Sequence, residues 1–173
     1  PIGKQDQYAA SFGGINHIKF KRSGKVLVKQ FRNKYIMKEL KKRLIVINTG
    51  VIKNNFKILK EQKKNINLKG ESVNNLLFMK NSVSIFYKEL LNKNFQNCGE
   101  IIHENWIKKT ELSKNINNDF FSDIYEECLN LGAYGGKILG AGGRGYLLLI
   151  APTNKIPLIK KKFKKLNFLD FDF

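Results

Sequence analysis

The alternation of apolar and polar residues predicts three strand regions in the chain. Within residues 15–31, apolar side chains alternate on both sides of Ser23-Gly24, which predicts a β-hairpin. Leu44–Ile47 and Tyr146–Ile150 are instead continuously apolar. Such runs are typical of strands that are covered on both faces. We therefore expect a solvent-facing hairpin and a separate, buried sheet.

Helical spacing dominates the region between the two buried strands. Apolar residues recur there at intervals of three and four in four successive stretches: Ile52 to Leu59, Val73 to Leu91, Phe95 to Trp106, and Phe121 to Cys128. A last helix is predicted at Ile156–Leu166, with Thr153 or Asn154 as its cap and Pro157 in its first turn. Together the elements predict an α+β fold, with helices packed on a largely antiparallel sheet.

An opening helix from about Gln5 to Phe12 is predicted to end at Gly13-Gly14. It places Asp6 in its first turn, where the unpaired backbone N–H groups and the helix dipole favour a carboxylate. A charge at a helix end is the ordinary explanation for such an aspartate. A functional role has to come from the rest of the chain.

Composition narrows the class of protein. With 173 residues, 42% of them hydrophobic, the chain can bury a real core. No apolar run approaches the roughly 20 residues that cross a bilayer, and the opening segment lacks a signal-peptide pattern, so we expect a cytoplasmic protein. Cys98 and Cys128 fall on apolar helix faces without a metal-binding spacing, which predicts buried free thiols.

The chain is strongly basic, with 32 Lys and Arg against 14 Asp and Glu and a net charge of +18. Such an excess can indicate nucleic acid, an acidic membrane surface or phosphorylated substrates as partners. The basic residues are nearly all lysines, however, and they are scattered among many Asn and Ile residues, as a coding bias toward A and T produces. Only residues 160–165 concentrate them, beside an apolar stripe that fits docking onto the domain.

A glycine-rich segment precedes the second buried strand. Residues 140–145 satisfy the spacing GxGxxG, but a strand follows them, whereas a dinucleotide fingerprint requires a helix there. The glycines therefore predict either a tight packing turn or a backbone loop whose N–H groups approach an anion. The local sequence does not decide between the two.

Three segments in this order resemble the GHMP small-molecule kinases: IGKQDQYAASFGG, RLIVINTG and GAYGGKILGAGGRGYLLLIAP. The first of these, with residues 103–109, is most similar to the branch that contains the heptose 7-phosphate kinases. The resemblance implies a GHMP-kinase-like, ferredoxin-like C-terminal domain over residues 43–173. It also implies that residues 1–42 are a remnant of the N-terminal kinase domain, and that the ATP-binding half with its phosphate loop and metal-binding acid lies outside this chain.

The resemblance also implies roles for individual residues. Asp6 is expected to be the catalytic base, because a carboxylate beside the sugar hydroxyl that attacks ATP can orient this hydroxyl and take its proton. Phosphoryl transfer otherwise depends mainly on alignment and charge stabilisation. The expected substrate-binding residues are Gln5, Gln7, Tyr8, Thr49 and Gly50, with simple termination of the strand as the alternative reading of Thr49-Gly50. The expected phosphate loop comprises Gly140, Ala141, Gly142, Gly143, Arg144 and Gly145. ATP and Mg²⁺ are the expected cofactors, held mainly by the other half, with no metal ligand in this segment.

Some positions depart from the family pattern. Arg144 stands where this branch usually has glycine; it either adds a phosphate-binding guanidinium or is a surface residue without function. After Thr49-Gly50, Lys53, Asn54 and Asn55 replace a frequent arginine. His17 and His103 have no partners typical of a metal site or a triad, and are expected to be structural or rim residues.

The implied activity is ATP-dependent phosphorylation of the anomeric hydroxyl of D-glycero-D-manno-heptose 7-phosphate or a related sugar phosphate. The alternative is a catalytically silent basic domain that binds RNA or an acidic partner. No aromatic pair on a strand, GXXG between helices or arginine-rich stripe supports RNA binding. A membrane-surface role for the basic last helix is a third alternative.

Overall fold

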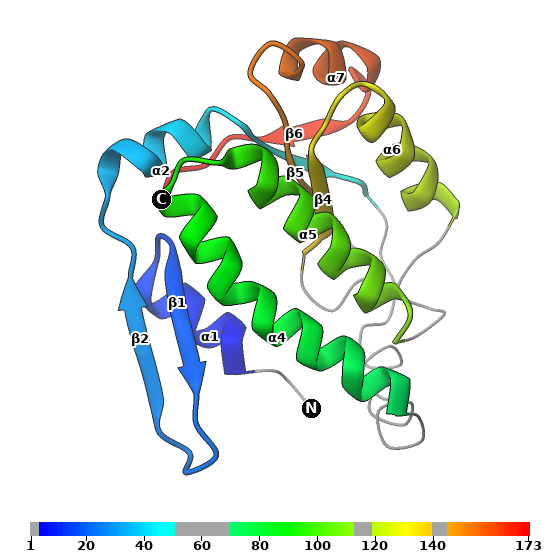
Figure 1. The fold of residues 1–173 in the computed structure, drawn as a ribbon. Helices are drawn as coiled ribbons and strands as arrows, with labels where there is room; N and C mark the ends of the chain where they lie inside the picture. Colours follow the sequence, from blue (N-terminus) through cyan, green and yellow to red (C-terminus); the bar gives the residue numbers. More distant parts are fainter. Residues whose placement is uncertain (1–3, 51–69, 113–118, 140–144) are drawn as a thin grey trace.

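The computed structural model describes residues 4–50, 70–112, 119–139 and 145–173. Its elements are α1 (Lys4–Phe12), β1 (Asn16–Phe20), β2 (Val26–Gln30), α2 (Lys34–Lys41), β3 (Leu44–Asn48), α4 (Gly70–Leu91), α5 (Phe95–Thr110), α6 (Asp119–Asn130), β4 (Gly135–Ile138), β5 (Tyr146–Ile150), α7 (Ile156–Lys162) and β6 (Asn167–Leu169) (Figure 1). The fold is α+β, as the sequence predicts.

The strands form two antiparallel sheets. β1 and β2 make the hairpin, and the larger sheet has the order β4-β5-β3-β6. In the larger sheet Asn48 of β3 lies opposite Tyr146 of β5, and Ile138 of β4 lies opposite Leu147. The end of β3, the end of β4 and the start of β5 therefore meet at one edge of the sheet.

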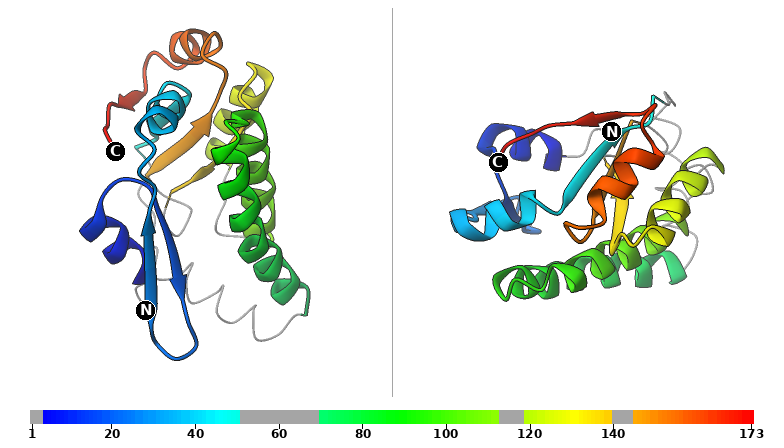
Figure 2. Two further views of the ribbon diagram at one scale, coloured as in Figure 1. Left: turned by 60° about the vertical axis from the view of Figure 1, so that its left-hand side comes forward. Right: turned by 90° about the horizontal axis from the view of Figure 1, so that it is seen from above.

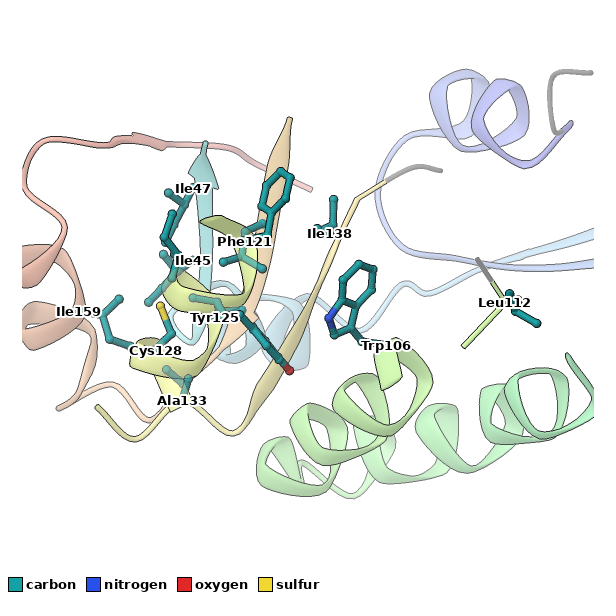
Figure 3. Close-up of a cluster of buried hydrophobic side chains, with 14 residues drawn as sticks. Ile45, Ile47, Trp106, Leu112, Phe121, Tyr125, Cys128, Ala133, Ile138 and Ile159 are labelled. Carbon is teal, nitrogen blue, oxygen red and sulfur yellow. The ribbon is translucent and has the colours of Figure 1, made fainter. Parts of the chain in front are cut away.

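One core lies between this sheet and helices α5, α6 and α7 (Figure 3). Ile45 and Ile47 of β3 are paired with Leu149 and Leu147 of β5, so that alternate residues of both strands share a face. They are joined by Phe121, Tyr125 and Cys128 from α6, Trp106 from α5 and Ile159 from α7. Full burial of each large apolar side chain contributes about 1.5–3 kcal/mol to folding.

Helices α4 and α5 run side by side along one side of the sheet (Figures 1 and 2). A second core joins α2, α4 and α5 through Ile36, Leu40, Leu90, Phe95 and Cys98. Cys98 and Cys128 are buried free thiols, as predicted, and burial raises the pKa of each to about 12. Both thiols therefore stay protonated and unreactive near neutral pH.

Glycines allow α5 to approach β4 unusually closely. A Cβ atom at Gly99 of α5 would collide with the side chain of Tyr134, and one at Gly135 of β4 would collide with the backbone of Gly99. The same added atom at Gly135 would lie 2.9 Å from the Cβ atom of His103. The helix and the strand are thus in contact through their backbones.

The hairpin is attached to the helical layer through aromatic rings. The ring of Tyr87 in α4 lies 5.8 Å from that of His17 in β1 and 6.1 Å from that of Phe31, measured between ring centroids. The imidazole of His17 therefore packs at the hairpin–helix boundary, which agrees with the structural role expected for it.

The hairpin, the opening helix and both buried strands were predicted correctly, whereas α2 and β4 were not predicted. The helix expected at Ile52 to Leu59 lies outside the described residues. The expected cap of the last helix was wrong, since Lys155 occupies that position without a side-chain cap hydrogen bond, although Pro157 does lie in the first turn. Among the described residues, no helix combines the length and apolarity that a membrane span requires.

Candidate functional site

Two of the predicted site segments meet at the edge of the larger sheet. The backbone N–H and the hydroxyl of Thr49 both donate hydrogen bonds to the carbonyl oxygen of Gly145, each at 2.8 Å. Thr49 is 5% exposed, so both hydrogen bonds are largely shielded from water. Thr49 thereby joins the end of β3 to the residue that precedes β5.

Glycine follows Thr49, and the partner in the contact, Gly145, is itself a glycine. Gly50 has a φ of +69° and Gly145 a φ of +90°, backbone conformations that residues with a Cβ rarely adopt. The Gly50 N–H donates to the Asn48 side-chain oxygen at 3.0 Å, which closes a turn directly after β3. The predicted phosphate-loop residues Gly140, Ala141, Gly142, Gly143 and Arg144 lie outside the described residues, and their role stays a prediction.

Helix α1 presents Asp6 at its first turn, as the sequence predicts. Gln5, Asp6 and Gln7 are exposed, whereas the ring of Tyr8 is half-buried at an edge-on distance of 5.6 Å from the ring of Phe20. At the other end of the helix, the Gly13 N–H donates to the Ala9 carbonyl at 3.0 Å, with Gly13 at a φ of +60°. The Gly-Gly break thus ends α1 as a helix C-cap.

A cleft of about 260 Å³ opens between α4, α5 and β4. Most of its wall is apolar. Its lining residues are Met79, Ser82, Val83 and Phe86 of α4, Ile101, Ile102, Asn105, Trp106 and Lys109 of α5, and Lys137 of β4. Two lysines from different elements therefore share a largely apolar cleft.

Burial depresses the proton affinity of both lysines. Burial first, and then the charge of Lys137, lower the pKa of Lys109 to about 8, while the carboxylate of Asp6 acts in the opposite direction. Burial also lowers the pKa of Lys137 below its ordinary value. The two ammonium groups thus repel each other across the cleft. Asp6, on α1, lies within electrostatic reach of Lys109.

Hydrogen bonds between α4 and α5 fix the walls of the cleft. The Asn105 amide donates to the hydroxyl of Ser82 at 2.8 Å and to the Ile101 carbonyl at 2.7 Å. Farther along the helices, the Asn75 amide donates to the Glu111 carboxylate at 2.7 Å. The buried polar side chains of Asn75 and Ser82 are thereby satisfied within the helix pair.

A tyrosine from α6 holds β4 in place beside the cleft. The Gly136 N–H donates to the Tyr125 hydroxyl at 3.1 Å, and the hydroxyl oxygen lies 3.2 Å from the Gly136 carbonyl oxygen and 2.7 Å from His103 Nδ1. Because Lys137 follows Gly136, this network fixes the strand segment that carries the second lysine. His103 is a structural residue here, as expected.

The sequence did not single out Lys109 and Lys137 as functional residues. In a chain with so many lysines neither stands out, and only the packing of α5 on β4 brings them together. One signal was available: Lys137 lies between Gly-Gly and Ile-Leu, an unusual place for a solvated surface lysine. In the part of the chain that the structure describes, no three His, Cys, Asp or Glu residues are grouped as metal ligands.

Comparison with known proteins connects this arrangement with one family. Residues 86–167, which include α5, β4, β5 and α7, match the family model described as GHMP kinases C terminal. This part of the chain is therefore similar to the C-terminal domain of the GHMP kinases. The cleft therefore lies largely within the matched residues, and α4 begins before them.

Similarity to a known kinase is not limited to residues 86–167 but covers nearly the whole chain. The chain is 32% identical over 174 residues to D-glycero-alpha-D-manno-heptose 7-phosphate kinase of Campylobacter jejuni subsp. jejuni serotype O:2, covering 99% of the chain and 51% of that protein. It therefore spans about half the length of this curated relative.

Solved structures share the fold. Mevalonate kinase of L. major, in complex with R-mevalonate, matches with a TM-score of 0.75 and 21% identity, covering 92% of this chain and 47% of that one. A D-glycero-D-manno-heptose 1-phosphate kinase of Bacteroides thetaiotaomicron matches with a TM-score of 0.57 and 19% identity, covering 99% and 48%. At these identities the likeness shows the fold.

Proposed function

We propose that the chain forms the acceptor side of an ATP-dependent sugar-phosphate kinase. The substrate proposed is D-glycero-D-manno-heptose 7-phosphate or a related sugar phosphate, which is phosphorylated on its anomeric hydroxyl. The observation that carries the proposal is the 32% identity to a heptose 7-phosphate kinase along 99% of the chain. The proposed protein is cytoplasmic, where ATP and sugar phosphates are available.

Asp6 is the proposed base of the reaction. Its carboxylate, at an exposed helix start, can accept a hydrogen bond from the sugar hydroxyl, orient its oxygen for attack, and take its proton as the new O–P bond forms. The neighbours of Asp6 at the start of α1 are proposed to bind the sugar; they are Gln5, Gln7 and Tyr8. Thr49 and Gly50 are proposed to shape the substrate side at the end of β3.

ATP supplies the phosphoryl group, and Mg²⁺ neutralises the charge that develops on its oxygens. We propose that residues 140–145 approach those oxygens with backbone N–H groups, which glycines leave uncovered. The Thr49–Gly145 hydrogen bonds support this role, because they anchor the last residue of the segment to the buried sheet. Nucleotide binding is proposed to depend mainly on the half of the relatives that this chain does not match.

The proposal is tested by ADP release with Mg·ATP and heptose 7-phosphate. The full-length protein that contains residues 1–173 is compared with the 173-residue chain and with the full-length Asp6→Asn variant. We expect turnover by the full-length protein, and loss of turnover with retained nucleotide binding in Asp6→Asn. Retained turnover in that variant would remove Asp6 from the mechanism.

The net charge of +18 favours a second candidate, a silent basic domain that binds nucleic acid or an acidic partner. Counterion release makes such binding fall steeply with salt. Titration of a fluorescent single-stranded RNA at several salt concentrations distinguishes the two. A steep, saturable response in a protein without turnover on any sugar phosphate would favour this candidate.

A further inference from the structure

We propose that Lys109 and Lys137 bind the phosphate group of the sugar-phosphate substrate, and that the cleft between α4, α5 and β4 holds the carbon chain next to that phosphate. The inference rests on the proposed function and deepens it. It assigns the discrimination between a sugar phosphate and a free sugar to two residues that lie outside the predicted site.

The cleft brings two cations together from separate elements. Lys109 comes from the last turn of α5 and Lys137 from the middle of β4, and both side chains line the same cleft. Each charge is penalised by burial, and the charge of Lys137 also disfavours that of Lys109. A phosphate dianion between them would offset both the burial and the repulsion, since it accepts charge-assisted hydrogen bonds from two ammonium groups.

The backbone positions that carry these lysines are fixed by the fold. Gly99 and Gly135 hold the backbones of α5 and β4 in contact, and the Tyr125 hydroxyl binds Gly136, the neighbour of Lys137. A preorganised pair of cations binds an anion without the cost of assembling it. Such an arrangement is expected of a binding site rather than of two solvated surface lysines.

The direction of the cleft also fits a sugar phosphate. The carboxylate of Asp6 favours the charged form of Lys109, so the proposed base is near enough to act electrostatically on the cleft. The anomeric hydroxyl and the terminal phosphate are at opposite ends of a heptose 7-phosphate. A substrate with its hydroxyl at Asp6 and its phosphate at the lysines would place its carbon chain along the apolar wall, which includes Ile102 and Trp106.

The first experiment measures steady-state kinetics of the full-length protein on heptose 7-phosphate and on the same heptose without its phosphate. The variants are Lys109→Met and Lys137→Met, which keep most of the side-chain volume and remove the charge. Lys108→Met is the matched control, because Lys108 is the neighbouring lysine on α5 and pairs with Glu111 at 3.2 Å instead of lining the cleft. Lys109→Arg and Lys137→Arg restore the charge.

We expect KM for heptose 7-phosphate to rise about tenfold to a hundredfold in each Met variant, the range for a lost charged hydrogen bond, with kcat nearly unchanged. The arginine variants recover part of the affinity, and Lys108→Met is unaffected. Activity on the unphosphorylated sugar does not change. An equal fall in kcat on both sugars would overturn the proposal, because the lysines would then act on the phosphoryl group in transfer. An unchanged KM would overturn it as well.

A second experiment is independent of turnover. The full-length protein is treated briefly with acetic anhydride, and modification of each lysine is measured by mass spectrometry without ligand, with heptose and with heptose 7-phosphate. We expect heptose 7-phosphate to protect Lys109 and Lys137, and heptose not to protect them. If neither lysine is protected in a protein that turns over normally, the phosphate site is wrong and the proposed function stands. If both are protected in a protein without turnover, the kinase proposal fails and the phosphate site stands.

Discussion

The carbonyl oxygen of Gly145 accepts two hydrogen bonds from one residue, Thr49, through its backbone N–H and its hydroxyl. The N–H bond continues the antiparallel pairing of β3 with β5 by one step beyond the strand ends. The hydroxyl bond adds a side-chain contact that sequence periodicity cannot reveal. Thr49 is therefore better described as an anchor for the residue that ends the glycine segment than as a simple strand terminator.

Replacing Thr49 with valine removes the hydroxyl bond and keeps the shape of the side chain. We expect the free energy of unfolding to fall by about 1 kcal/mol, the ordinary value of such a bond, because the N–H still satisfies the Gly145 carbonyl. Urea unfolding measures the change. Thr49→Ser retains the hydroxyl and serves as the control, and a Thr49→Val variant as stable as wild type would contradict the anchoring role.

Replacing Asp6 with asparagine retains the hydrogen-bonding shape and removes the base. We expect turnover of the full-length protein to fall by about a hundredfold or more, since a positioned general base contributes about that much. Stability should hardly change, because Asp6 is exposed. Glu104, an exposed acidic residue on α5, provides the control through Glu104→Gln, which is expected to turn over like wild type.

The lowered pKa of Lys109 predicts how stability depends on pH. The unfolded chain keeps this proton until about pH 10.5, whereas the folded protein releases it near pH 8. Between these values the unfolded state binds more protons, so this group makes the free energy of unfolding rise with pH. The penalty from the buried charge is therefore greatest below pH 8.

Urea unfolding of wild type, Lys109→Met and Lys108→Met at pH 7.5, 8.5 and 9.5 tests this dependence. We expect wild type to gain up to about 1.4 kcal/mol per pH unit relative to Lys109→Met above pH 8. Lys108→Met is expected to follow wild type. Parallel pH profiles for wild type and Lys109→Met would show that the Lys109 ammonium is not penalised in the folded state.

Close contact between α5 and β4 predicts that a single methyl group at Gly99 is costly. We expect Gly99→Ala to lower the free energy of unfolding by about 1–3 kcal/mol or more, the range for overpacking, because the methyl would meet Tyr134. Gly70→Ala on α4 is the control, since a Cβ atom there meets none of the described residues within 4 Å. Thermal unfolding of both variants measures the difference, and equal stabilities would contradict the backbone contact.

Removal of the Tyr125 hydroxyl is expected to cost more than an ordinary hydrogen bond. Tyr125→Phe leaves the Gly136 N–H without its side-chain partner in a buried position, which costs about 1–3 kcal/mol. Phe120→Tyr, which adds a hydroxyl at an exposed position of the same helix, serves as a neutral control. A Tyr125→Phe variant as stable as wild type would show that β4 holds its place without this bond.

Local patterns predicted those elements whose formation depends on neighbours in sequence. The continuous apolar runs gave β3 and β5 their buried positions, and Gly13-Gly14 ends α1 as expected. Helix α2 was missed although its signals are local, with Asn33 as N-cap and Ile36 and Leu40 one turn apart. β4 was missed because two glycines conceal its strand character, and its pairing with β5 is set by the tertiary fold.

The candidate site divides in the same way. Asp6 could be found because a helix start and a family motif coincide at it. Lys109 and Lys137 could not, because their meaning depends on a contact between α5 and β4 and on burial. Neither the contact nor the burial can be read from the sequence, and lysine is too common in this chain for these two to stand out. The Thr49–Gly145 link likewise joins residues far apart in the chain.

The contact between Gly99 and Gly135 makes the width of the cleft independent of the lysine side chains that line it. Backbone atoms set the distance between α5 and β4, so exchanging the side chains at positions 109 and 137 changes the charge presented to a ligand while the gap stays the same. Selectivity at this site can therefore be redesigned, or can diverge in evolution, by two substitutions. Both would leave the backbone contact between Gly99 and Gly135 in place.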